Sequence, residues 1–238
     1  MAYAKCLRLD VGFDGIKNMP GIKPREKVNR QWSPKLAYAV GLLATDGNLS
    51  PDGRHLNFTS KDFELIESFK HCLGIENKIG KKAREASKAK RYFYVQFGDV
   101  VFYRFLLTLG LTPAKSKTIG KLDIPAEYFF DFLRGSFDGD GTFFSYWDPR
   151  WRSSFMFYTV FISASINHLN WIREEIHKRL DVLGHITHDG RRITYHLKYA
   201  KKDSLKILKR MYYNPDIIYL KRKYLKIEKA LSTIGLTL

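Results

Sequence analysis

Cysteine is scarce in this sequence, whose 238 residues include only Cys6 and Cys72. Neither residue has a Cys-x-x-Cys partner or a Cys/His partner at a metal-binding spacing. We therefore expect no zinc site built from thiolates. Two isolated thiols are typical of a protein from a reducing compartment.

Long apolar runs and targeting segments are also missing. No apolar stretch approaches the roughly 20 residues that a membrane span needs. The first 30 residues lack the continuous apolar core of a signal peptide. Asp10, Asp14 and Glu26 in this region argue against a mitochondrial presequence. We expect an intracellular protein, in the cytoplasm or nucleoid, or in an organelle if its gene lies there.

Acidic residues are outnumbered, because 41 Lys and Arg face 24 Asp and Glu and give a formal net charge of +17. The excess is spread over predicted helices and strands, so the folded surface should carry a positive potential. A polyanionic partner follows, and nucleic acid is the leading candidate. A basic protein without such a partner and an acidic membrane surface are the alternatives.

One kind of segment occurs twice: an apolar helical run that contains a glycine and ends in Asp-Gly. Residues 36–47 read LAYAVGLLATDG, and residues 132–141 read FLRGSFDGDG. When Gly41 is aligned with Gly135, Asp46 aligns with Asp140. The duplication suggests two units related by sequence.

The order of predicted elements repeats in the same way. After each glycine-bearing helix we expect two strands, a helix, two strands and a helix, an α+β arrangement of antiparallel sheets. This divides the chain into an N-terminal arm (1–32), a first αββαββα half (33–122) and a second αββαββα half (123–238). In the second half, Gly184 is expected to stop a helix over residues 169–183.

The two aspartates at the helix ends need an explanation, because a carboxylate is disfavoured at the negative end of a helix dipole. Gly41 and Gly135 would let the two helices pack closely, which would bring Asp46 and Asp140 near each other. A divalent cation such as Mg²⁺ would offset the repulsion between them. The alternative is that each Asp-Gly pair merely ends its helix through turn chemistry.

The repeated segments resemble a known family. AVGLLATDG at 39–47 and LRGSFDGDG at 133–141 are similar to the two motifs of a single-chain LAGLIDADG homing endonuclease. The second match is close, whereas the first has Ala44 and Thr45 before the aspartate. The resemblance implies a monomer in which two pseudo-twofold-related halves form a saddle of antiparallel sheets on double-stranded DNA.

The resemblance also implies a chemistry. Asp46 and Asp140 would bind the metal ions that hydrolyse one phosphodiester on each strand of a long target site, leaving 3′ overhangs. The backbone carbonyls of Gly47 and Gly141 would add further metal ligands. Mg²⁺ is the expected ion, Mn²⁺ is another candidate, and Ca²⁺ could bind without supporting cleavage. The glutamine that some members place at the end of the second strand is replaced by Ser60, and by Ala164 or Ser165 in the second half.

A cation near each scissile phosphate would stabilise charge or organise the attacking water. Two basic segments fit this role, AKSK at 114–117 and LKRK at 220–223. Analogy with the family favours Lys117 and Lys223, with Lys115 and Lys221 as the alternatives. For each lysine, an ordinary contact with the phosphate backbone is the competing role.

DNA-reading residues are expected on the strand faces that point away from the apolar core. In the first half these are His55, Asn57, Thr59, Tyr92, Tyr94 and Gln96, and in the second half Thr194, His196 and Lys198. Arginines in predicted turns could reach bases or phosphates. They are Arg84, Arg91, Arg150, Arg152, Arg191 and Arg192.

These observations favour a site-specific endonuclease of the intron-homing type. An RNA maturase, which would use the same basic surface to bind intron RNA and assist splicing, is the first alternative. A DNA-binding regulator without cleavage activity is the second, although such a protein would usually have lost one of the two acids.

Overall fold

The computed structural model describes residues 26–83, 91–188, 190 and 193–238. Most of the predicted arm, together with Arg84, Arg191 and Arg192, therefore lies outside the described residues. The first half contains α1 (Pro34–Thr45), β1 (Gly47–Leu49), β2 (His55–Ser60), α2 (Phe63–Leu73), β3 (Ile79–Lys82), β4 (Tyr92–Gly98) and α3 (Val100–Thr108).

The second half repeats this order and adds a C-terminal helix. It contains α4 (Phe129–Gly139), β5 (Thr142–Trp147), β6 (Phe155–Ser163), α5 (Ile166–Leu180), β7 (His185–His188), β8 (Tyr195–Ala200), α6 (Lys201–Met211) and α7 (Lys221–Ser232). Each half forms one four-stranded antiparallel sheet, in the orders β1-β2-β4-β3 and β5-β6-β8-β7. The predicted α+β fold with its duplicated αββαββα order is confirmed.

Local sequence accounts for most helix ends. The Ser33 hydroxyl accepts a hydrogen bond from the backbone N–H of Leu36 (3.2 Å), and Pro34 occupies the first helical position of α1. Gly74 ends α2 in the left-handed conformation, with φ of 63°. The expected helix over 169–183 was wrong at both ends. The helix α5 begins three residues earlier, at Ile166, with Ser165 as its N-cap. It ends at Leu180, and Asp181 adopts the left-handed conformation after it, where we expected Gly184 to stop the helix.

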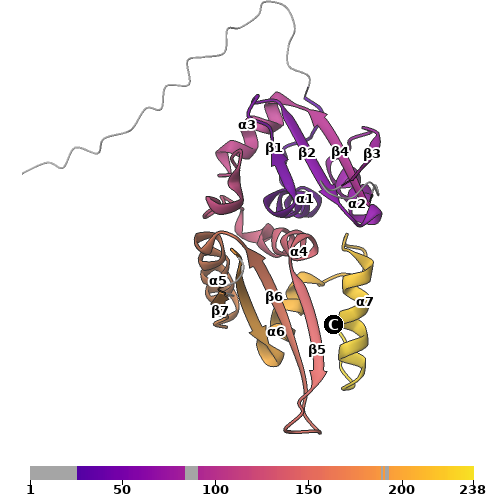
Figure 1. The fold of residues 1–238 in the computed structure, drawn as a ribbon, viewed down its shortest axis with the longest axis vertical. Coiled ribbons are helices and arrows are strands. Elements are labelled where there is room, and N and C mark those ends of the chain that lie inside the picture. The colour runs from indigo at the N-terminus through magenta and orange to yellow at the C-terminus, as the bar shows by residue number, and fades with distance from the viewer. Residues whose placement is uncertain (1–25, 84–90, 189, 191–192) are drawn as a thin grey trace, which may run out of the picture.

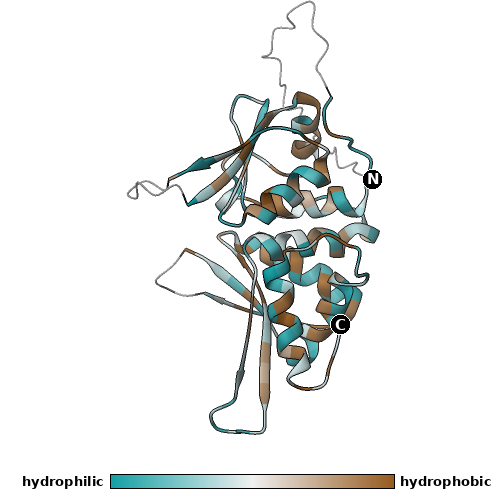
Figure 2. Ribbon diagram, turned by 90° about the vertical axis from the view of Figure 1, so that its right-hand side faces the viewer, coloured by the Kyte–Doolittle hydropathy of each residue, from teal (hydrophilic) through white to brown (hydrophobic). Residues whose placement is uncertain are grey.

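Helices cover one face of each sheet and leave the other face uncovered (Figure 2). Alternation along the strands produces this difference. In β2, Leu56 and Phe58 are fully buried against the helices, while the alternating residues His55, Asn57 and Thr59 are only half-buried. Phe58 packs on Phe69 of α2, with ring centroids 4.5 Å apart. Each sheet therefore has one face in a core and one face free to meet a ligand.

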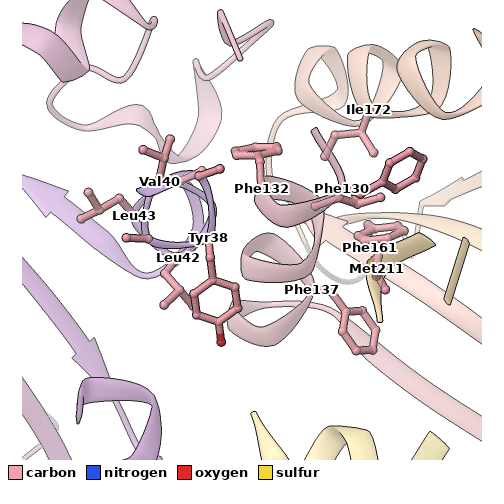
Figure 3. Packing of buried hydrophobic residues seen from close by; sticks show 14 of the residues in the cluster. Tyr38, Val40, Leu42, Leu43, Phe130, Phe132, Phe137, Phe161, Ile172 and Met211 are labelled. Carbon is pink, nitrogen blue, oxygen red and sulfur yellow. The ribbon is translucent and has the colours of Figure 1, made fainter. Parts of the chain in front are cut away.

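The helices α1 and α4 lie side by side between the two halves (Figures 1 and 3). A Cβ atom at Gly41 would be 2.2 Å from the carbonyl oxygen of Phe132, and one at Gly135 would be 2.1 Å from the carbonyl oxygen of Tyr38. Only glycine permits this approach. Leu43 points away from α4, and Phe130 points away from α1 (Figure 3). Close backbone packing at these two glycines thus brings the halves together.

A buried polar network fixes this contact. The Oδ2 atom of Asp138 accepts hydrogen bonds from the Tyr38 hydroxyl of α1 and from the backbone N–H of Leu220, both at 2.8 Å. The Arg134 side chain is 1% exposed, pairs with Asp131 (2.7 Å) and donates to backbone carbonyls ahead of α7 and at the end of α6. These contacts tie α1, α4 and the start of α7 together.

Replacing Tyr38 by Phe tests this network. The change leaves the shape of the side chain intact but removes one of two hydrogen bonds to a buried carboxylate, so we expect the free energy of unfolding to fall by about 1–3 kcal/mol. Urea unfolding measures the loss. Tyr92→Phe, on a half-exposed side chain of β4, is the control and should change stability by less than about 0.5 kcal/mol. Equal stabilities of the two variants would contradict the network.

The C-terminal helix α7 starts beside the first half. The Arg222 guanidinium makes two hydrogen bonds with the carboxylate of Asp62, at 2.8 and 2.7 Å, and the backbone N–H of Lys221 lies 3.3 Å from Glu64. Asp62 is the N-cap residue of α2. A helix that belongs to the second half by sequence is therefore anchored to the first. Among the described residues, no helix has the length and apolar character of a membrane span.

Candidate active site

Asp46 and Asp140 occupy equivalent places at the ends of the two central helices. Each is a C-cap residue, and its backbone N–H bonds to the helix, Asp46 to Leu42 (3.0 Å) and Asp140 to Ser136 (3.3 Å). Because α1 and α4 run side by side, their ends meet and the two carboxylates share one electrostatic environment. Burial, and then the charge of Asp140, raise the pKa of Asp46 to about 7. Burial likewise raises the pKa of Asp140.

Two buried lysines complete the cluster. The Nζ atom of Lys115 donates to the carbonyl oxygen of Gly47, and the Nζ atom of Lys223 donates to that of Gly141 at 2.6 Å. These glycines directly follow Asp46 and Asp140, so the two lysines are related by the same duplication. The side chains are only 5% and 8% exposed. Burial lowers the pKa of each lysine to about 8, although nearby carboxylates act in the opposite direction.

The geometry favours Lys115 over Lys117, the residue that the family analogy preferred. Lys115 opens a short 3-10 turn (Lys115–Lys117) directly after Ala114, which has the left-handed φ of 54°. Residues two apart in such a turn differ by about 240° in direction. Lys117 is consequently exposed on the surface, while Lys115 is buried and donates to the carbonyl oxygen of Gly47, next to Asp46. In α7 the same argument places Lys223 inside and Lys221 outside.

The donor set fits a hard divalent cation with incomplete protein ligation. The carboxylates of Asp46 and Asp140 both have raised pKa values, and such an ion would relieve the repulsion between them. No cluster of three or more His, Cys, Asp or Glu side chains occurs within the described residues. Mg²⁺ commonly uses one or two carboxylates and takes its other ligands from water and substrate phosphate. The carbonyls of Gly47 and Gly141 already accept from the lysines, and each retains a second lone pair.

A polar groove leads from Asp46 across the uncovered face of the first sheet. It encloses about 480 Å³ and is lined by Asp46, Asn48, Ser50, His55, Leu56, Asn57, Thr59, Lys82 and Gln96. Four predicted DNA-reading residues, His55, Asn57, Thr59 and Gln96, therefore lie together. Tyr92 and Tyr94 lie on the same face of β4, where Tyr94 pairs with Thr59. Asn48 and Lys82 were missed, although the alternation of β1 could have indicated Asn48.

In the second half the predicted residues are more dispersed. Lys198 and His196 of β8 pair across the sheet with His185 and Thr187 of β7, and Thr194 precedes β8. Arg150 and Arg152 are exposed in the connection between β5 and β6, and Arg91 is exposed just before β4. Arg150 lies near the Asp148 carboxylate, with its Nε atom 3.5 Å away. The described arginines thus border the two uncovered sheet faces.

The comparisons with known proteins identify the class of fold. Neither a family model nor a curated protein matches this sequence. Among solved structures, I-SmaMI bound to an uncleaved DNA target in the presence of calcium ions is similar over 86% of this chain and 92% of that chain, with a TM-score of 0.57 and 15% identity. Mesophilic variants of the homing endonuclease I-DmoI match over 76% of this chain and 96% of theirs, with a TM-score of 0.51 and 16% identity.

A third similar structure is the N-terminal LAGLIDADG domain of DUF199/WhiA, with a TM-score of 0.51, 17% identity and coverage of 76% of this chain and 83% of that domain. The full-length WhiA protein from Thermatoga maritima has a TM-score of 0.52 and 16% identity over 87% of this chain, which spans 63% of that protein. The chain therefore has the two-half LAGLIDADG fold, and its structural neighbours include homing endonucleases.

Proposed function

We propose that the protein is a site-specific DNA endonuclease that uses divalent metal ions to hydrolyse one phosphodiester on each strand. The observation that carries the proposal is the placement of Asp46 and Asp140, two carboxylates with raised pKa values, beside the buried lysines Lys115 and Lys223 at the contact between α1 and α4. Two equivalent sets of charged groups suit two equivalent bonds on opposite strands. The halves 33–122 and 123–238 would each contribute one set.

In this proposal, Asp46 and Asp140 hold the ions, and the carbonyls of Gly47 and Gly141 are further candidate ligands. When bound, a divalent cation supplies Lewis-acid stabilisation of the phosphate and lowers the pKa of a bound water. Lys115 and Lys223 place fixed positive charge next to the reacting phosphate, where it stabilises the developing negative charge. Their anchoring to carbonyl oxygens holds each ammonium in position before DNA arrives.

Charge and shape support DNA as the substrate. The net charge of +17 favours a polyanion, and the two uncovered sheet faces lie on the same side of the molecule (Figure 2). I-SmaMI has been solved on an uncleaved DNA target with calcium ions, so calcium is the ion to use when binding is measured without cutting. We propose that Mg²⁺ supports cleavage, that Mn²⁺ can replace it, and that the protein acts as a monomer.

The test is to incubate the protein and Mg²⁺ with the uninterrupted version of its host gene and to map the cut on each strand. We expect one cut per strand, offset to leave 3′ overhangs, and no cut when the metal is chelated. Specific binding of the duplex without any cutting would instead make the protein a DNA-binding regulator. Binding confined to the intron RNA, with splicing lost when the protein is absent, would favour a maturase.

The two lysines of the AKSK segment give a matched comparison. Lys115→Met removes the buried ammonium beside the aspartates and should lower the single-turnover cleavage rate by about 100- to 1000-fold, as expected for loss of one preorganised electrostatic group. Lys117→Met removes an exposed charge from the same turn and should change the rate by less than about fivefold. A larger loss of rate in Lys117→Met than in Lys115→Met would contradict the role proposed for Lys115.

A further inference from the structure

The uncovered faces of the two sheets differ in chemistry although their topology is the same. Gly47 and Gly141 directly follow Asp46 and Asp140, so they are equivalent positions in the two halves. Counting along β1 and β5 from these glycines, and across to the paired strands β2 and β6, gives the other equivalent positions. Asn48 and Asn57 face each other in the first half, and the equivalent pair in the second half is Thr142 and Val160. Ser50 and His55 are likewise replaced by Phe144 and Tyr158. Small polar side chains and an imidazole in the first half thus correspond in the second half to Thr142 and to three larger aliphatic or aromatic side chains.

Phe144 and Tyr158, together with Tyr146 of the same strand as Phe144, form what we call the aromatic patch. Their ring centroids are 5.1, 6.2 and 6.4 Å apart, and their planes differ by only 8 to 18°. Phe144 and Tyr146 remain 36% and 41% exposed. They point away from the core, because Phe143, which directly precedes Phe144 and lies on the opposite face of β5, is buried against Phe157.

The tyrosine hydroxyls of the patch are engaged with each other. The hydrogen bond between the Tyr158 and Tyr146 hydroxyls, followed by burial, raises the pKa of Tyr158. Met156, which pairs with Tyr146 across the strands, extends the apolar surface. The β5–β6 hairpin that carries the patch runs far from the contact between the halves (Figures 1 and 2). The patch therefore offers carbon-rich contact area on the side where the first half offers hydrogen-bonding groups.

Duplex DNA is the occupant that the surroundings favour. Exposed Arg150 and Arg152 lie in the connection at the end of the hairpin, and Lys198 lies on the same sheet face. These cations can position a phosphate backbone. A two-stranded ribbon fits the major groove, where the thymine 5-methyl is the apolar group that base edges present. Amide side chains such as Asn57 and Gln96 instead match the hydrogen-bonding edge of adenine.

We propose that the two halves read different base chemistry, and that the aromatic patch selects a half-site rich in thymine through contacts with the 5-methyl groups. The proposal rests on the proposed function, in which a DNA duplex lies across both sheets. It names as specificity-determining residues Phe144 and Tyr146 of the aromatic patch and the neighbouring Met156.

The first step of the test selects duplexes from a randomised library with the wild-type protein and no added metal ion, so that no strand is cut. We expect A·T pairs to be enriched in the half-site bound by the second half, and we expect loss of the thymine methyl groups to weaken binding in that half-site and not in the other. The dissociation constant is then compared between the selected duplex and copies in which deoxyuridine replaces thymidine, which removes only the methyl group. Each contacted methyl should be worth roughly fourfold in affinity.

Two variants of the aromatic patch and one control variant in the first half complete the test. Phe144→Ser, which introduces the residue type of Ser50, should bind thymidine and deoxyuridine duplexes equally, and Tyr146→Ser should reduce the difference. Asn57→Ala in the first half should weaken binding to both duplexes by the same factor. Both patch residues are exposed enough for the variants to fold, and the deoxyuridine comparison itself needs no variant.

The outcomes separate this proposal from the proposed function. Selection of a defined duplex with no enrichment of A·T pairs in the half-site bound by the second half, or with no effect of deoxyuridine, would overturn the thymine proposal and leave the endonuclease proposal standing. Tighter binding of single-stranded than of duplex DNA by the protein would also overturn the thymine proposal. The aromatic patch would then stack on unpaired bases instead of contacting thymine methyl groups. If no duplex sequence is preferred at all, both proposals fail.

Discussion

Replacing Asp46 by Asn is expected to lower DNA cleavage by at least about a thousandfold while leaving binding of the target within a few-fold. Asparagine keeps the size of the side chain but supplies no negative charge to a metal ion. Loss of several kcal/mol of charge stabilisation corresponds to roughly this factor, because about 1.4 kcal/mol is tenfold in rate. Asp140→Asn should behave in the same way. Single-turnover cleavage in Mg²⁺ and gel-shift binding in Ca²⁺ measure the two properties.

Asp123→Asn is the control for these variants, because Asp123 is an exposed carboxylate outside the cluster. It should cleave at the wild-type rate. Binding by the Asp46 and Asp140 variants can even strengthen, since each change removes a negative charge that would face the phosphates. Retained cleavage by both single variants would refute the assignment of the active site, whatever their affinity for DNA.

Replacing Gly135 by Ala is expected to destabilise the protein by at least about 3 kcal/mol. The added Cβ atom would lie 2.1 Å from the Tyr38 carbonyl oxygen and 3.2 Å from the Gly41 Cα atom. Overpacking usually costs about 1–3 kcal/mol when side chains can move aside. Here the obstacles are backbone atoms of the neighbouring helix, so α1 and α4 must separate. For a chain of this size the melting temperature should fall by roughly 6–12 °C.

Gly120→Ala provides the matched control for the helix contact, because an added Cβ atom there would meet nothing within 4 Å. This variant should melt within about 2 °C of the wild type. Gly41→Ala should resemble Gly135→Ala, since its Cβ atom would lie 2.2 Å from the Phe132 carbonyl oxygen. The melting temperatures of the Gly135, Gly41 and Gly120 variants, measured by thermal unfolding, test this prediction. Equal melting temperatures would show that the two helices do not touch at these glycines.

Much of the fold could be predicted from the sequence because the signals were local and occurred twice. Ser33-Pro34 marks the start of α1, and the alternation along β4 identifies its buried face. The duplication then supported each weak signal with a second one. Helix ends were harder to predict from the sequence. The end of α5 depends on which of Asp181 and Gly184 takes the left-handed conformation, and both residue types can do so.

The candidate site could be predicted only in part, for similar reasons. Asp46 and Asp140 stand out because the same spacing from glycine recurs. The choice between Lys115 and Lys117 depends on the direction of a short turn, which has no periodicity to read. The aromatic patch was not recognised, since Phe144 and Tyr146 look like core residues until the strand pairing shows which face they share.

The anchoring of α7 to the first half limits how such halves can be exchanged. Lys223 donates to the carbonyl oxygen of Gly141, next to Asp140, yet its helix also contacts Asp62 of α2. The residue before that helix is held by the same Asp138 that binds Tyr38 of α1. A chimera that kept residues 123–238 and received a foreign first half would therefore inherit a displaced lysine unless Tyr38 and Asp62 came with it. Recombination between such proteins is constrained by a few contacts that lie outside the DNA-reading surface.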